Sequence, residues 1–281
     1  MTSVSDRYDR AAASYARYWA PVLADASRRL LDLLEADRAV DPRSPMTVLD
    51  VGTGGGGLAF DVLARWQSAH VVAADASSGM LESARETAST LEASQRERLT
   101  FAHGPADAVP VPSASVDLII SSFVYQLVPD RRSAFREALR VLRPGGQLGL
   151  VTWIAKDEEP FVAADEFDEA VYDLEIQDPE HPDEEVAGDY ESARAARGEL
   201  RWAGFSRVEV RELLLDYQWE LESYLDYKRN YGESGLFSSL GTDAAERLAA
   251  RARERLSVLR PEAFRWRTPV VYAFGTKPRS A

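Results

Sequence analysis

The sequence contains no cysteine and only three histidines, His70, His103 and His181, among its 281 residues. Without cysteine, the chain cannot form disulfides, Cys-ligated zinc sites, iron–sulfur clusters or thiol nucleophiles. Three scattered histidines provide little material for a multi-histidine centre, so we expect no metal site. No apolar run approaches the roughly 18 residues of a membrane span, and the first residues lack the apolar core of a signal peptide. We therefore expect a cytoplasmic protein with no membrane partner.

The negative charge of the chain, −13 at pH 7, is concentrated in one segment. Residues 157–191 contain 16 Asp and Glu and no Lys or Arg, so the other residues hold 30 acids and 33 bases. Nucleic acid needs a basic surface, so we expect no nucleic-acid partner. We interpret the acidic segment as a solvated helical face, with a cationic acceptor or a basic carrier protein as alternatives.

Short apolar segments alternate with amphipathic ones between residues 46 and 153. The apolar segments are rich in β-branched residues, as is typical of buried strands in a parallel sheet. This alternation predicts an α/β fold, with an open sheet and helices on both of its faces. The predicted strands are residues 46–51, 70–75, 98–103, 116–121 and 147–153, and the helices between them are residues 56–68, 78–93 and 130–142.

The flanking sequence predicts further helices and two more strands, at residues 206–213 and 268–277. Residues 1–38 have helical periodicity with a break at Pro21, and Tyr8, Tyr15 and Tyr18 share one helical face. We divide the chain into an N-terminal helical cap (1–45), a core (46–153), an acidic lid insertion (154–191), a core helix and strand (192–216), a helical lid (217–265) and a terminal core strand (266–281).

A glycine-rich turn, VLDVGTGGGG at residues 48–57, joins the first predicted strand to the next helix. Glycine permits a tight turn and lets a ligand approach the backbone. Free N–H groups at the start of the helix favour electron-rich ligand groups. Gly52, Gly54 and Gly57 match the dinucleotide pattern G-x-G-x-x-G, whereas Gly52, Gly54 and Gly56 match G-x-G-x-G, which suggests S-adenosylmethionine. The glycines alone leave both cofactors open.

Two carboxylates help to decide between these cofactors. Asp75 ends the second predicted strand, where it can accept hydrogen bonds from the hydroxyls of a ribose. Asp50 lies two residues before Gly52. A carboxylate so close to the turn repels a diphosphate, but it suits the sulfonium and ammonium groups of S-adenosylmethionine. The residues therefore predict a nucleoside site at the carboxyl edge of the sheet and favour S-adenosylmethionine.

Four ordered motifs resemble the class I S-adenosylmethionine-dependent methyltransferases. They are VLDVGTGGGG (48–57), VVAADASSGML (71–81), FAHGPADAVPVPSASVDLIISSFVYQLVPD (101–130) and ALRVLRPGGQLGLVTW (138–153). The closest resemblance is to the small-molecule branch, which includes the ubiquinone and menaquinone biosynthesis type. It implies a Rossmann-like, seven-stranded, mostly parallel sheet with helical lid insertions, in which the last strand is antiparallel beside the fifth.

The resemblance also implies roles for individual residues. The methionine part of the cofactor would pass Gly52 and Gly54, and the ribose would bind Asp75. Pro105 stands where the family often has aspartate, so Asp107 is a substitute contact for the adenine. The implied cofactor residues are Tyr15, Asp50, Gly52, Thr53, Gly54, Asp75, Ala76, Met80, Ala106, Asp107 and Ser121.

Methyl transfer requires a general base only if the acceptor must lose a proton, and bases are few here. His103 and His181 are the candidates. Aromatic stripes on predicted helices have two interpretations: they pack the helices onto the sheet, or they cover a flat or apolar acceptor, such as an aromatic or polyketide-like metabolite. The candidate acceptor residues are Tyr18, Gln126, Tyr224, Tyr227 and Tyr231.

Three other functions remain open at this point. The fold could bind S-adenosylmethionine without transferring its methyl group, as in a cyclisation or decarboxylation. It could be a dinucleotide oxidoreductase, although Asp50 and the Arg-Pro-Gly-Gly turn at 143–146 disfavour that class. It could also be a non-catalytic partner protein. A homodimer formed through the helical lids is compatible with all of these.

Overall fold

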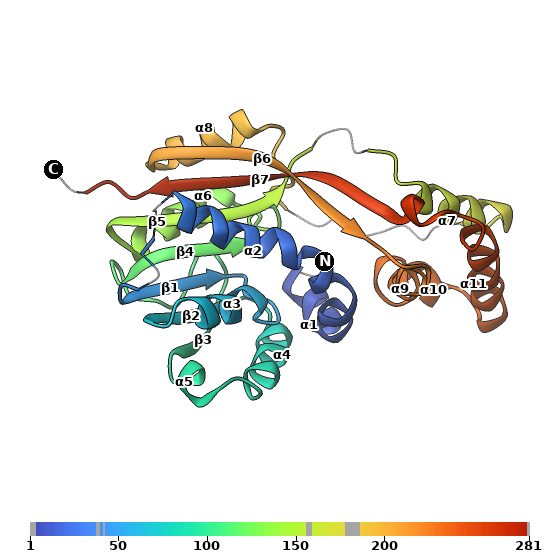
Figure 1. Cartoon of the computed structure of the whole chain (residues 1–281), viewed down its shortest axis with the longest axis horizontal. Coiled ribbons are helices and arrows are strands. Elements are labelled where there is room, and N and C mark those ends of the chain that lie inside the picture. The colour runs from blue at the N-terminus through green and yellow to red at the C-terminus, as the bar shows by residue number, and fades with distance from the viewer. Residues whose placement is uncertain (1–3, 38–39, 42, 156–158, 178–185, 280–281) are drawn as a thin grey trace.

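A seven-stranded sheet forms the centre of the computed structural model, which describes residues 4–37, 40–41, 43–155, 159–177 and 186–279 (Figure 1). The strand order is β3-β2-β1-β4-β5-β7-β6. The first five strands run parallel, and β7 lies antiparallel between β5 and β6. The strands are β1 (Met46–Val51), β2 (Ala69–Asp75), β3 (Leu99–His103), β4 (Val116–Ser122), β5 (Leu142–Trp153), β6 (Ser206–Gln218) and β7 (Arg265–Thr276). The predicted fold class is confirmed.

Helices cover both faces of this sheet. On one face, α2 (Ala20–Ala36) and α3 (Gly57–Arg65) contribute leucines such as Leu30 and Leu63 to the core. On the other face, α6 (Arg131–Val141) and α8 (Ala193–Ala203) contribute Phe135 and Leu200. The amphipathic segment after β2 forms α4 (Ser78–Ala88) and the short α5 (Ala93–Arg96).

The two antiparallel strands extend beyond the rest of the sheet. Pairing between β5 and β7 ends at Val270, whereas β6 and β7 stay paired as far as Gln218 and Arg265. Pro269 lies just past the last β5 pair, where its missing N–H breaks no bond to β5. The predicted strand segments were therefore too short. The resulting ribbon reaches the helices at the right of Figure 1.

These outlying helices have their own apolar core around Phe167, Tyr224 and Leu248. They are α7 (Val162–Asp173), α9 (Leu221–Tyr227), the π-helical turn η2 (Lys228–Gly232), α10 (Ser234–Ser239), α11 (Thr242–Leu256) and the 3₁₀ turn η3 (Pro261–Phe264). From here on we call all of them the helical lid, which combines α7 of the predicted acidic lid insertion with the helices of residues 217–265.

The N-terminal residues remain helical from Val4 to Ala36, so the predicted break at Pro21 is wrong. The segment consists of α1 (Val4–Ser14), a π-helical turn η1 (Tyr15–Trp19) and α2. Pro21 lies in the first turn of α2, a position that tolerates the missing N–H. The wider π turn precedes it and changes the rotation of the residues that follow.

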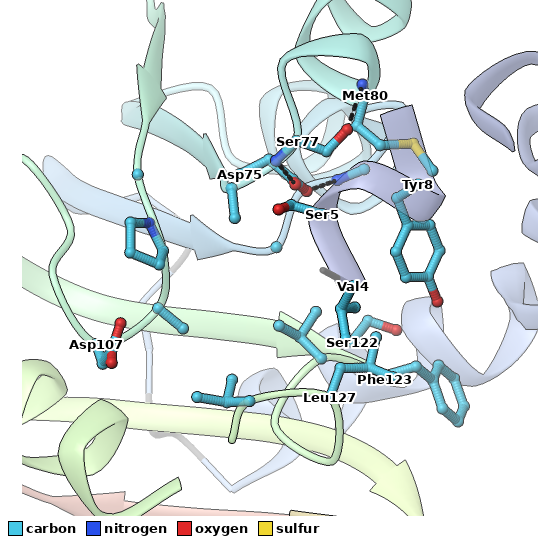
Figure 2. A pocket seen from close by; sticks show the side chains of 18 of the residues that line it. Val4, Ser5, Tyr8, Asp75, Ser77, Met80, Asp107, Ser122, Phe123 and Leu127 are labelled. Carbon is cyan, nitrogen blue, oxygen red and sulfur yellow. Dashed lines mark hydrogen bonds between the residues drawn. The ribbon is translucent and has the colours of Figure 1, made fainter. Parts of the chain in front are cut away.

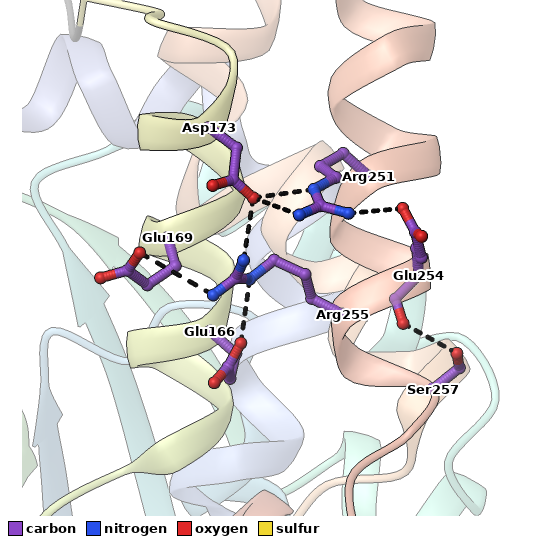
Figure 3. Close-up of polar contacts among 7 residues, drawn as sticks. All are labelled: Glu166, Glu169, Asp173, Arg251, Glu254, Arg255 and Ser257. Atoms are coloured by element: carbon purple, nitrogen blue, oxygen red, sulfur yellow. Dashed lines mark hydrogen bonds and ion pairs between the residues drawn. The ribbon is translucent and has the colours of Figure 1, made fainter.

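The acidic face of α7 is paired within the chain rather than simply solvated (Figure 3). Arg255 of α11 contacts Glu166 at 2.9 Å and Asp173 at 2.8 Å, and Arg251 contacts Asp173 at 2.6 Å. These partly exposed pairs join α7 to α11. His181 lies outside the described residues. Among the helices that the structure describes, none is long and apolar enough to span a membrane.

Candidate functional site

A cavity of about 450 Å³ opens at the carboxyl ends of the parallel strands (Figure 2). Its walls come from α1 and η1, from the glycine turn after β1, from the ends of β2 and β3, and from the loop after β4. We call it the first cavity. Eight of the predicted cofactor residues line it: Tyr15, Gly52, Gly54, Asp75, Ala76, Met80, Ala106 and Asp107.

The glycine turn has a backbone that only glycine adopts readily. Gly52, Gly54 and Gly56 have φ angles of +71°, +54° and +89°, whereas Gly57 is not among the residues with positive φ. A Cβ atom on Gly52 would lie 2.2 Å from a methyl carbon of Val124, which also lines the cavity. The conformation therefore requires the G-x-G-x-G set rather than the G-x-G-x-x-G set.

Asp75 presents its carboxylate at the base of the first cavity. One oxygen accepts from the backbone N–H of Gly54 at 2.8 Å and the other from that of Ser77 at 2.9 Å. Each oxygen keeps a further lone pair for a ligand hydroxyl. Burial raises the pKa of Asp75, and these backbone donors oppose the shift. The site therefore combines two fixed carboxylate oxygens of Asp75 with a glycine turn whose backbone is uncovered at Gly52.

Three predicted cofactor residues do not line the first cavity. The Asp50 carboxylate lies beneath the turn, where the hydroxyl of Thr53 donates to it at 2.7 Å. Burial raises the pKa of Asp50 to about 7. The Ser121 hydroxyl donates to the carbonyl of Val51 at 2.8 Å. These side chains support the backbone around the cavity, because each forms a hydrogen bond with a buried polar group near the turn.

Sequence reasoning missed two parts of the cavity wall. Val4, Ser5 and Tyr8 of α1 form one. The other comprises Ser122 at the end of β4 and the loop of residues 123–129, in which only Gln126 was a predicted site residue. The signal for α1 was the tyrosine stripe that includes Tyr8. The signal for the loop was its place directly after a strand that ends at this edge of the sheet.

A second cavity, of about 220 Å³, adjoins the first and shares Tyr8, Tyr15, Phe123 and Leu127 with it. Its remaining lining residues are Arg7, Trp19, Leu23, Gln126, Trp153, Val186, Gly188 and Asp189. The amide of Gln126 is fixed there: its nitrogen donates to the Phe123 carbonyl at 2.8 Å, and its oxygen accepts from Thr152 at 2.5 Å.

The predicted acceptor tyrosines lie in three different places. Tyr227 and Tyr231 stack on Trp19, with ring centroids 5.5 Å and 6.2 Å apart, and so stand behind the wall of the second cavity. Tyr224 is buried in the core of the helical lid. Tyr18 lines neither cavity, because the π turn rotates it away from Tyr15. Of the five candidates, only Gln126 lines the second cavity.

Of the two candidate bases, His103 lines neither cavity, and His181 lies outside the described residues. His103 is exposed, and its Nε2 lies 3.0 Å from the carbonyl of Ala76. Burial raises the pKa of Tyr15 and of Tyr231, so both hydroxyls stay protonated near neutral pH. In the part of the chain that the structure describes, no group of His, Asp and Glu side chains could hold a metal ion.

Residues 48–146 match the family model of a methyltransferase domain. The core of the chain is a class I methyltransferase domain. Trans-aconitate 2-methyltransferase from Azoarcus sp. is 37% identical over 125 residues, which are 44% of each chain. Demethylmenaquinone methyltransferase from Clavibacter sepedonicus is 33% identical over 145 residues, 52% of this chain and 56% of that protein. The chain spans about half the length of the curated relatives it matches.

Solved structures share the methyltransferase fold over most of the chain. Phosphoethanolamine N-methyltransferase 2 from Haemonchus contortus, in complex with S-adenosyl-L-methionine, has a TM-score of 0.53 and 18% identity. The matched region comprises 89% of this chain and 52% of that protein. The [4+2]-cyclase SpnF has a TM-score of 0.54 and 18% identity, with coverage of 91% and 82%. At such identities the likeness shows the fold alone.

Proposed function

We propose that this protein is an S-adenosylmethionine-dependent methyltransferase that acts on a small molecule. The observation that carries this proposal is the pair of joined cavities: one has a glycine cradle and Asp75, and the other has aromatic walls. S-adenosylmethionine is the cofactor, and when bound it supplies an activated methyl group. Gly52 and Gly54 leave room for its methionine part, Asp75 accepts from its ribose, and Met80 packs on its adenine.

The acceptor occupies the second cavity. Trp19, Phe123 and Trp153 give this cavity flat apolar walls, and Gln126 adds a fixed buried amide. Such walls favour an aromatic or polyketide-like metabolite with a planar part. Tyr8, Tyr15 and Phe123 border both cavities. The two reactants therefore meet where the cavities join, beside these three side chains. We expect no nucleic-acid substrate.

The chain acts mainly through position and the exclusion of water. A displacement at an activated methyl group needs the acceptor atom held about 3–3.5 Å from the methyl carbon, in line with the leaving sulfur. The described lining residues include no imidazole. An acceptor that is already nucleophilic needs no base, and Asp189 brings a carboxylate to the second cavity for one that must lose a proton.

Calorimetric titration with S-adenosylhomocysteine tests the cofactor site. We expect the parent protein to bind it and Asp75→Ala to lose at least tenfold in affinity. Asp25→Ala, an exposed substitution on α2, is the matched control and should bind like the parent. An absence of binding by the folded parent protein contradicts the proposal.

Mass spectrometry of products from a panel of phenols, hydroxyquinones and polyketides then tests methyl transfer. A product that gains one methyl group in place of a hydrogen supports the proposal. A rearranged product of unchanged mass, formed only with bound cofactor, would instead identify a non-methylating enzyme of the same fold.

A further inference from the structure

The outer surface of α8 carries three exposed arginines, Arg194, Arg197 and Arg201, although the chain has an excess of acids. Their spacing of three and four residues places them on one side of the helix. None forms an ion pair with a carboxylate of the described residues. Elsewhere in this protein exposed or partly exposed arginines commonly find one, as in Arg65–Asp32, Arg143–Asp117, Arg211–Asp37, Arg253–Glu222 and Arg265–Asp216.

An exposed tryptophan adjoins these arginines. Trp202 follows Arg201 and is 66% exposed, which makes it one of the most exposed large apolar side chains of the described residues. The guanidinium of Arg132, from α6, lies 4.5 Å from the centroid of its ring. Tryptophan and arginine are the residues that most often contribute strongly to binding at protein interfaces.

A glycine lies within the same surface. Gly198 is in the middle of α8, where glycine destabilises a helix relative to alanine. A Cβ atom there would meet no atom within 4 Å, and the φ angle is not positive. Neither packing within the chain nor backbone conformation therefore requires glycine at this position. A bare backbone between arginines lets the backbone of another helix approach closely.

We call the surface formed by Arg132, Arg194, Arg197, Gly198, Arg201 and Trp202 the arginine face. We propose that the arginine face binds an acidic helix of a partner protein, packed over Gly198 with its carboxylates on the three arginines of α8. Charge complementarity identifies the partner as acidic. The exposed Trp202 beside the arginines favours a protein surface over a nucleic acid.

Contacts join the two helices of the arginine face, α6 and α8, to residues that line the cavities. Val128 and Pro129 line the first cavity just before α6 begins. Arg131 donates to the carbonyl of Gly188, which lines the second cavity, at 2.8 Å, and to Glu199 of α8 at 2.7 Å. A partner on the arginine face would therefore sit beside the acceptor site and be connected to its wall through Arg131.

Fluorescence anisotropy with a labelled synthetic peptide tests the proposal on the full chain. The probe is a helix of about 20 residues, long enough to be helical in water, with glutamates along one face and alanines beside them. We expect Arg194→Glu/Arg197→Glu/Arg201→Glu to lower its affinity at least tenfold. Gly198→Leu should lower the affinity as much while leaving the melting temperature equal or higher. Trp202→Ala should lower the affinity severalfold.

The matched control, Arg43→Glu/Arg247→Glu/Arg260→Glu, reverses the charge at three exposed arginines outside the arginine face. It should bind the peptide like the parent. An equal loss in this control would show unspecific attraction and overturn the proposal. So would tighter binding of an oligothymidylate that the α8 variant abolishes, which would indicate a nucleic-acid surface. A dimer of the parent in sedimentation velocity that Gly198→Leu abolishes would assign the face to a second copy of this chain.

Discussion

The carboxylate of Asp9 accepts a hydrogen bond from the backbone N–H of Gly79 at 2.8 Å, across 70 residues of sequence. The same oxygen accepts from the hydroxyl of Ser77 at 2.6 Å. Helix α1 thus rests on the positive N-terminal end of α4. Gly79 makes this contact possible, because a Cβ atom there would lie 2.9 Å from the Asp9 carbonyl oxygen. Since α1 also walls the first cavity, this contact holds a cover over it.

The contact predicts that Asp9→Asn releases S-adenosylhomocysteine faster. An amide keeps the shape of the side chain but loses the charged acceptor, which is worth about 1–2 kcal/mol beside two donors. We expect the dissociation rate in stopped-flow measurements to rise about five- to thirtyfold. Asp25→Asn, exposed on α2, should leave the rate unchanged. An unchanged rate in folded Asp9→Asn would mean that α1 does not retain the ligand.

The parts that sequence could predict are those determined by local patterns. Short β-branched runs predicted five strands of the parallel sheet, and the glycine turn with Asp75 predicted one wall of the first cavity. Both follow from the order of residues in a strand–turn–helix unit. The Asp9–Gly79 contact could not be predicted in this way, because it depends on how α1 is placed against α4.

The aromatic stripes show where periodicity fails. A regular helix would keep Tyr15 and Tyr18 on one face, but the π turn η1 changes the number of residues per turn between them. Tyr224 has the helical spacing of a cavity residue, yet its ring packs against Trp219 and Phe264 inside the helical lid. Spacing identifies a shared face, and only the tertiary structure shows what that face contacts.

Substitutions at two positions of the glycine turn should show whether Gly52 is required there. Gly52→Ala places a methyl group at φ +71° and 2.2 Å from Val124, so we expect a loss of about 1–3 kcal/mol in unfolding free energy and weaker S-adenosylhomocysteine binding. Gly57→Ala, at the start of α3 with nothing within 4 Å, should be neutral or stabilising. Denaturant titration and calorimetry measure both. Equal effects at the two positions would refute the conformational requirement.

Two buried tyrosines should respond in opposite directions to loss of the hydroxyl. The Tyr224 hydroxyl has no hydrogen-bond partner among the described residues, so Tyr224→Phe should be neutral or stabilising by up to about 1–2 kcal/mol. The Tyr272 hydroxyl donates to the carbonyl of Ala26 at 3.0 Å, so Tyr272→Phe should cost about 1 kcal/mol. Thermal unfolding of both variants under one condition makes the comparison. A larger loss for Tyr224→Phe would reveal a partner for its hydroxyl.

The buried carboxyl of Asp50 predicts a pH dependence of stability. Its pKa is raised from 3.8 to about 7, mainly by burial, so between these values the folded protein binds a proton that the unfolded chain does not. Folding is therefore opposed increasingly as pH rises from about 4 to 7, by at most about 1.4 kcal/mol per pH unit, and the opposition is constant above that window. Asn cannot ionise, so Asp50→Asn lacks this dependence.

The free energy of unfolding of Asp50→Asn, measured relative to the parent, isolates this effect from the other carboxyls. We expect the variant to gain stability relative to the parent as pH rises from 4.5 to 7.5, because only the parent must bury a charge at the higher pH. Thr53 can still donate to the amide oxygen, so the variant retains the bond that holds the turn. A difference that stays constant across this range would show that Asp50 is ionised throughout, and that its surroundings stabilise the charge despite its burial.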